Sequence, residues 1–162
     1  MSRVRIALVV DANVLIDYAN ADLTVLSLVS RVMGPLHVPD AVLDKVDQLD
    51  RHDCDQLGIR IVEPTLEQLL EAGERRGRLA YDDRLCLILA RDNTWSCTTN
   101  DRALRAECAE IGVEVLWSLQ PMITLVAEGE LGVEDAETVA SDIHESNPAF
   151  VTKEIVQKFR SK

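Results

Sequence analysis

Short runs of consecutive apolar residues recur along the chain, separated by longer segments whose apolar residues are three or four positions apart. The short runs are typical of strands buried on both faces, and the longer segments are typical of amphipathic helices. Because each connection between runs is long enough to carry a helix, the pattern predicts an α/β fold with a parallel sheet and helices on both faces. The predicted strands cover residues 6–10, 36–38, 59–62, 95–99 and 113–117.

The predicted helices lie between these strands. Asn13 is expected to cap the first helix, and Thr65 with Gln68 forms a capping box at the start of the fourth. Residues 50–55 are polar and acidic, which indicates a turn or a frayed helix end. The helices are predicted at residues 13–18, 24–32, 40–49, 65–77, 82–91 and 102–111, with Gly77 and Gly112 as C-terminal stops.

The chain is expected to form one domain, because 162 residues, 47% of them hydrophobic, suffice for one substantial core but not for two large ones. After Ser118 the pattern changes to helices alone. We therefore expect an α/β core over residues 1–118 and a C-terminal helical extension over residues 119–162 that packs on the same domain.

The charge balance is acidic, with 17 Lys and Arg against 28 Asp and Glu, giving a formal net charge of -11. This charge disfavours broad nonspecific adhesion to nucleic acid or anionic lipid, although a local basic patch stays open. The four cysteines have no C-x-x-C spacing, so neither a zinc site nor a disulfide framework is indicated. The sequence shows no signal-peptide layout and no apolar stretch of membrane-spanning length, so we expect a cytoplasmic protein with no membrane partner.

Four aspartates fall at strand ends or on helices near the first strand, at Asp11, Asp44, Asp83 and Asp101. In open parallel sheets ligands collect outside the carboxyl ends of the strands, and a first strand beside the fourth brings two of these acids to one edge. Ionised carboxylates that lie close together repel, so such a cluster needs protons or hard cations. All-oxygen ligation suits Mg2+ or Mn2+, which predicts metal-assisted cleavage of a phosphodiester. The few scattered histidines offer no competing Ser/His/Asp or Cys/His arrangement.

Three segments together resemble the acidic signatures of the PIN domain family, in the family's order and spacing. They are Val-Val-Asp-Ala-Asn-Val-Leu-Ile-Asp (9–17), Leu-Ala-Tyr-Asp-Asp-Arg-Leu-Cys-Leu-Ile-Leu-Ala-Arg (79–91) and Thr-Thr-Asn-Asp-Arg-Ala-Leu (98–104). The resemblance implies a three-layer α/β/α sandwich with a parallel sheet of about five strands. It also implies an Mg2+- or Mn2+-dependent endoribonuclease, with RNA as substrate. Many small bacterial and archaeal members are VapC-type toxins held by an antitoxin protein.

Carried over position by position, the resemblance places the metal-binding and catalytic acids at Asp11, Asp44, Asp83 and Asp101. The polar groups that support them would be Asn13, Asp82 and Thr99. Asp44 stands where the family usually has the longer Glu, so contact with the metal directly or through water stays open. The choice between Asp82 and Asp83 as the motif acid also stays open. Ala80 replaces a Ser that is frequent in the family's motif.

The basic residues before the second acidic signature have two interpretations. Arg75, Arg76 and Arg78 are candidates to contact RNA phosphates, or they complement the dipole of the preceding helix. The basic, amphipathic tail over residues 151–162 is expected to pack on its own domain or on a dimer partner, with an RNA contact as the lower-ranked alternative. We also expect a homodimer.

Other functions remain to be weighed against the nuclease. The acids taken one by one fit helix caps and turns, and Asp44 fits a solvated helix face. A noncatalytic PIN-like module that binds metal or RNA is the main alternative. A phosphoacceptor receiver domain ranks lower, because it needs an acidic pair after the first strand and a Lys after the last, where this chain has Asp11-Ala12-Asn13 and Ser118-Leu119.

Overall fold

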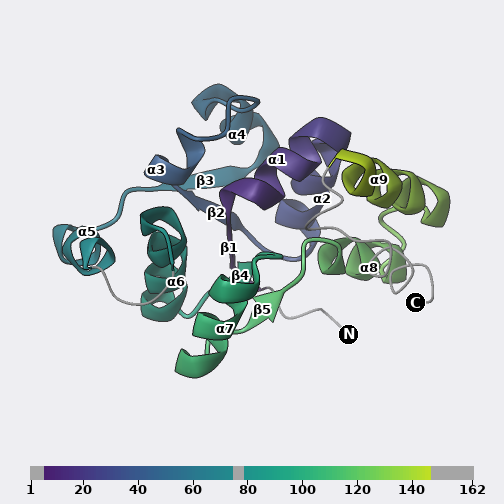
Figure 1. Ribbon diagram of the computed structural model, residues 1–162. Helices are drawn as coiled ribbons and strands as arrows, with labels where there is room; N and C mark the ends of the chain where they lie inside the picture. The colour runs from purple at the N-terminus through teal and green to yellow at the C-terminus, as the bar shows by residue number, and fades with distance from the viewer. Residues whose placement is uncertain (1–5, 75–78, 147–162) are drawn as a thin grey trace.

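The computed structural model describes residues 6–74 and 79–146, and every structural statement below concerns these residues. They form a five-stranded, entirely parallel sheet in the order β3-β2-β1-β4-β5 (Figure 1). The predicted fold class is therefore confirmed. The strands are Leu8–Val10 (β1), Leu36–Pro39 (β2), Ile59–Val62 (β3), Ser96–Thr98 (β4) and Val115–Leu116 (β5).

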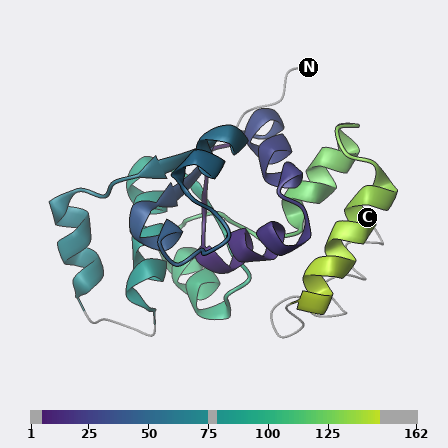
Figure 2. The same ribbon diagram turned by 90° about the horizontal axis from the view of Figure 1, so that it is seen from above.

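Helices cover both faces of the sheet. The contacts group α1, α2 and α4 on one face and α6 and α7 on the other, with α5 lying outermost against α6 (Figure 1). Two helices close the described chain beside α1 and α2, as Figure 2 shows from above. The helices are Ala12–Ala21 (α1), Thr24–Val32 (α2), Asp40–Leu43 (α3), Arg51–Leu57 (α4), Leu66–Gly73 (α5), Tyr81–Asn93 (α6), Arg102–Ile111 (α7), Gln120–Ala127 (α8) and Val133–Ser146 (α9).

The central strand β1 organises the core. Its residues Leu8, Val9 and Val10 are all buried, as an apolar run covered by helices on both sides requires. The closing helices belong to the same core, because α9 packs on α1 and α8 packs on α2. Met122 and Ile143 are fully buried at these contacts. Within the described ranges, no helix has the length and apolar character needed to cross a membrane.

The helix predicted over residues 40–49 is wrong in length. α3 ends at Leu43, and the chain then continues in turns that bury Val46 and Leu49. The amide of Val46 donates to the carbonyl of Leu43 at 2.9 Å, a three-residue step rather than the four-residue step of an α-helix. Apolar residues three positions apart fit both conformations, so the spacing alone misled the prediction.

Residues 50–55, predicted to form a turn or a frayed helix end, are instead the capped start of α4. Asp50 accepts from the amide of Asp53 at 2.8 Å, and the Asp53 carboxylate accepts from the amide of Asp50 at 3.1 Å, which completes a capping box. An Asp in place of the usual Glu or Gln hid this signal in the sequence. The capping box predicted at Thr65 and Gln68 is confirmed. The predicted stop at Gly77 lies outside the described residues.

Candidate metal centre

The candidate site lies where the path of the chain changes direction across the sheet. From β1 the chain proceeds to β2 and β3 on one side, then crosses to β4 and β5 on the other. The register pairs Val10 with Thr98, so the residues that follow β1 and β4 leave the sheet side by side. Such a switch point opens a crevice at the carboxyl ends of the strands, which is where parallel α/β proteins place their ligands.

Asp11 lies at this switch point, directly after β1. Its side chain is 3% exposed, and Oδ1 accepts from the amide of Val14 at 2.9 Å, so Asp11 caps α1. The prediction that Asn13 caps this helix is therefore wrong. Asn13 lies exposed in the first turn of α1. The side chain that caps a helix must precede its first turn, and α1 begins one residue earlier than the sequence pattern indicated.

The surroundings of the Asp11 carboxylate disfavour its ionised form. Burial raises its pKa to about 6 from an ordinary 3.8, against the lowering effect of hydrogen bonds from Thr99 and Val14. The negative charges of Asp83 and Asp101 raise that pKa further. The three carboxylates come from three separate elements and are near enough for the charges of Asp83 and Asp101 to act on Asp11.

Asp101 approaches Asp11 from the end of β4. Its Oδ1 caps α7 by accepting from the amide of Leu104 at 2.9 Å. Thr99 links the two acids, because its hydroxyl donates to Asp11 Oδ2 and its oxygen accepts from the amide of Asp101 at 3.0 Å. Thr99 is fully buried, so this link is shielded from solvent. The link fixes the spacing between the loops after β1 and β4.

Asp83 completes the group from the first turn of α6. Burial raises its pKa most, and the charges of Asp101 and Asp82 raise it further, while Lys45 lowers it. Its neighbour Asp82 forms an ion pair with Lys45, from the turn after α3. Ala80 is the N-cap of α6, so Asp82 is not the helix cap. Asp83 is thus the member of the pair whose charge acts on Asp11, whereas Asp82 pairs with Lys45.

The remaining predicted residues are not at the centre of this group. Asp44 is the C-cap residue of α3 and is exposed, in the position of a solvated acid. Arg75, Arg76 and Arg78 lie outside the described residues, as does the basic tail.

The donor chemistry of the group fits a hard divalent cation. Carboxylate oxygens are the ligands that Mg2+ and Mn2+ prefer, and each oxygen has a second lone pair besides the one used in a hydrogen bond. Across residues 6–74 and 79–146, no three Asp, Glu, His or Cys side chains already stand at the close spacing of a formed metal cage. Binding an ion would therefore require small side-chain movements that bring the mutually repelling carboxylates closer together.

A second layer of residues, which the sequence reasoning missed, holds the loop after β4 in place. The Asn100 amide nitrogen donates to Ser118 Oγ at 2.7 Å, and the Ser118 amide donates to Asn100 Oδ1 at 3.1 Å. The Tyr18 hydroxyl, from α1, donates to the Ser118 carbonyl. Only the position of Asn100 beside Asp101 hinted at this role. These bonds tie the loop that carries Asp101 to α1, the helix that Asp11 caps.

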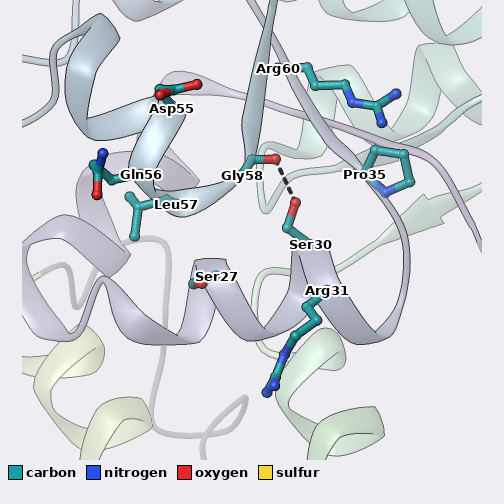
Figure 3. Close-up of a pocket in the computed structure, with 9 residues that line it drawn as sticks. All are labelled: Ser27, Ser30, Arg31, Pro35, Asp55, Gln56, Leu57, Gly58 and Arg60. Carbon is teal, nitrogen blue, oxygen red and sulfur yellow. Dashed lines mark hydrogen bonds between the residues drawn. The ribbon is translucent and has the colours of Figure 1, made fainter.

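A cavity of about 330 Å³ lies elsewhere, where β2 and β3 begin (Figure 3). Ser30 of α2 and Gly58 before β3 both line it, and the Ser30 hydroxyl donates to the Gly58 carbonyl at 2.7 Å. Arg60 and Pro35 line its other side. Since β2 and β3 start here, this cavity opens at the sheet edge opposite to the acids.

Removing the Thr99 hydroxyl is expected to disturb the acids without unfolding the chain. Because the Thr99 hydrogen bond lowers the pKa of Asp11, Thr99→Val should raise that pKa above about 6. Loss of an outer hydrogen bond to a ligand weakens metal affinity or activity by about 10- to 100-fold. A carboxyl-carbon NMR titration of Asp11 measures the shift. An unchanged midpoint would show that Thr99 does not act on Asp11.

Comparison with known proteins supports the fold. No protein-family model matches the sequence, and no curated protein matches it. Among solved structures, the chain is similar to a PilT N-terminus domain protein from the hyperthermophilic archaeon Sulfolobus solfataricus, with a TM-score of 0.50 and 10% identity. The match covers 74% of this chain and 92% of that one. The fold implied by the three acidic signatures is thereby confirmed, and the chain has the fold of a PilT N-terminus (PIN) domain.

Proposed function

We propose that the chain is a metal-dependent endoribonuclease whose Mg2+ or Mn2+ is held by Asp11, Asp83 and Asp101. The observation that carries the proposal is the placement of these carboxylates at the switch point of the sheet, where Thr99 links Asp11 after β1 to Asp101 after β4 and the first turn of α6, which packs on both strands, carries Asp83. A mutually repelling group at the place where this class of sheet binds ligands is best explained by a cation. The fold supports the proposal, because PIN domains are generally nucleases.

The residues of the chain prepare the site before RNA arrives. Val14 and Thr99 fix both oxygens of Asp11, and Leu104 fixes Asp101, so these two acids need little reorganisation to face an ion. A bound divalent ion supplies charge stabilisation at the phosphodiester and an acidified water as nucleophile. We assign Asp44, at the exposed rim, contact through water.

Incubation of the purified protein with total RNA tests the proposal. Cleavage is expected with Mn2+ or Mg2+ and is expected to stop with a chelator, and mapping the cut ends identifies the linkage. RNA that stays intact at every concentration of Mn2+ or Mg2+ would contradict the proposal that the protein is a nuclease. Uptake of Mn2+ without cleavage would favour the noncatalytic module, a candidate that the exposed position of Asp44 supports.

The resemblance to VapC-type toxins extends the proposal to partners. We propose that the protein forms a homodimer and that a small antitoxin covers the acids. Growth arrest on induced expression, relieved by a protein encoded in the adjacent gene, supports the toxin role. Unimpaired growth of cells that contain active nuclease contradicts it.

A further inference from the structure

Lys45 brings a positive charge to the rim of the acidic group. It lies in the turn after α3, which follows β2, the neighbour of β1 in the sheet. Its Nζ forms an ion pair with Asp82 Oδ2, and the Lys45 side chain is 63% exposed while that of Asp82 is 14% exposed. Asp82 thus holds the ammonium group next to Asp83 and leaves it open to solvent.

The charge of this ammonium group acts on one of the proposed metal ligands, Asp83. Lys45 lowers the pKa of Asp83, whereas the negative charges of Asp101 and Asp82 raise it. The segment after β2 therefore contributes a cation to the site, beside the acid that the resemblance predicted there, the exposed Asp44. Sequence reasoning had no reason to single out Lys45 from the other charged residues of its segment.

A lysine in this position is suited to bind a phosphate group of the substrate. An ammonium group has three N–H donors, and the ion pair with Asp82 uses at least one of them. Lysine binds phosphate oxygens as a compact point charge. RNA approaching a chain of net charge -11 must overcome repulsion, and a cation at the rim of the acids offsets that repulsion where the phosphates enter.

We propose that Lys45, anchored by Asp82, binds an RNA phosphate adjacent to the cleaved one. The proposal rests on the proposed function, because it assigns the substrate contact of that same site. The competing explanation is that the Lys45–Asp82 pair is a surface ion pair that only joins the turn after α3 to α6. A purely structural pair leaves the substrate affinity and its salt dependence unchanged.

Steady-state cleavage of a single-stranded RNA with Mn2+, measured over a range of NaCl concentrations, tests the proposal. Lys45→Ala is expected to raise KM about tenfold, as loss of a charge-assisted hydrogen bond does, with a smaller change in kcat. The dependence of log KM on log salt should become shallower by about 0.7, the value for one phosphate of a single strand. Lys45→Arg should restore most of the affinity.

Arg60→Ala is the matched control, because Arg60 is an exposed cation that lines the cavity at the opposite edge of the sheet. Its KM and salt dependence should equal those of the wild type. Thermal unfolding of each variant checks that it is folded. Lys45→Ala with wild-type KM and wild-type salt dependence would overturn the proposal while leaving the nuclease intact.

A second readout separates failure of this inference from failure of the proposed function. If the wild type cleaves no RNA with Mn2+, the nuclease proposal fails. Fluorescence anisotropy of a labelled RNA, with Mn2+ present, then decides the role of Lys45 by itself. About tenfold weaker binding by Lys45→Ala than by Arg60→Ala supports the phosphate contact, and equal binding overturns it.

Discussion

Replacing Asp11 by Asn is expected to reduce RNA cleavage at least about a hundredfold, because stabilisation by a bound metal contributes several kcal/mol at the transition state. Asn keeps the shape of Asp and can still accept the amide hydrogen of Val14, so the cap of α1 survives. The substitution removes the charge that acts on Asp83 and Asp101, and it replaces the oxygen that accepts from Thr99 by an NH2 group that cannot accept. Initial rates of RNA cleavage under saturating Mn2+ provide the measurement.

Asp47→Asn is the matched control, since Asp47 is an exposed acid in the turns after α3. The control should cleave RNA at the wild-type rate, and both variants should give the circular dichroism spectrum of the wild type. Full activity of Asp11→Asn under saturating Mn2+ would remove Asp11 from the mechanism.

The same substitution is expected to stabilise the metal-free protein at neutral pH. Burial raises the pKa of Asp11 in the folded state to about 6 from 3.8, so the folded state binds a proton more tightly than the unfolded chain. The cost of ionising Asp11 is therefore absent below about pH 4, grows between pH 4 and 6, and is complete above pH 6. The shift corresponds to about 3 kcal/mol.

Urea unfolding in a chelating buffer measures this effect. Asp11→Asn should exceed the wild type in free energy of unfolding by up to about 3 kcal/mol at pH 7.5, and by little near pH 4. Saturating Mn2+ should narrow the difference in free energy of unfolding at pH 7.5, because it stabilises the wild type more than the variant, which binds it more weakly. A variant that is no more stable than the wild type at pH 7.5 would show that ionised Asp11 does not destabilise the folded state.

The sheet was predictable because its strands are buried on both faces. An apolar run such as residues 6–10 fits few other environments, and each of the five runs overlaps one of the observed strands. The meeting of Asp11 with Asp101 followed from the same reasoning, since each acid comes soon after a strand and the two strands are neighbours. This part of the site depends only on topology.

The choice between Asp82 and Asp83 was not predictable, because consecutive residues of a helix point in directions about 100° apart. Which of them faces the other acids depends on how α6 packs, and which of them meets Lys45 depends on the turn after α3. That turn was itself mispredicted as helix. Contacts between segments far apart in the sequence leave no local pattern to read.

The central claim is that Asp11, Asp83 and Asp101 together bind one divalent metal ion. The most direct test is isothermal titration calorimetry of Mn2+ binding at pH 7.5. It compares the wild type with Asp11→Asn, Asp83→Asn and Asp101→Asn. We predict binding by the wild type, an affinity at least about tenfold weaker in each of the three variants, and an unchanged affinity in Asp47→Asn. Wild-type Mn2+ affinity in all three variants would contradict the account.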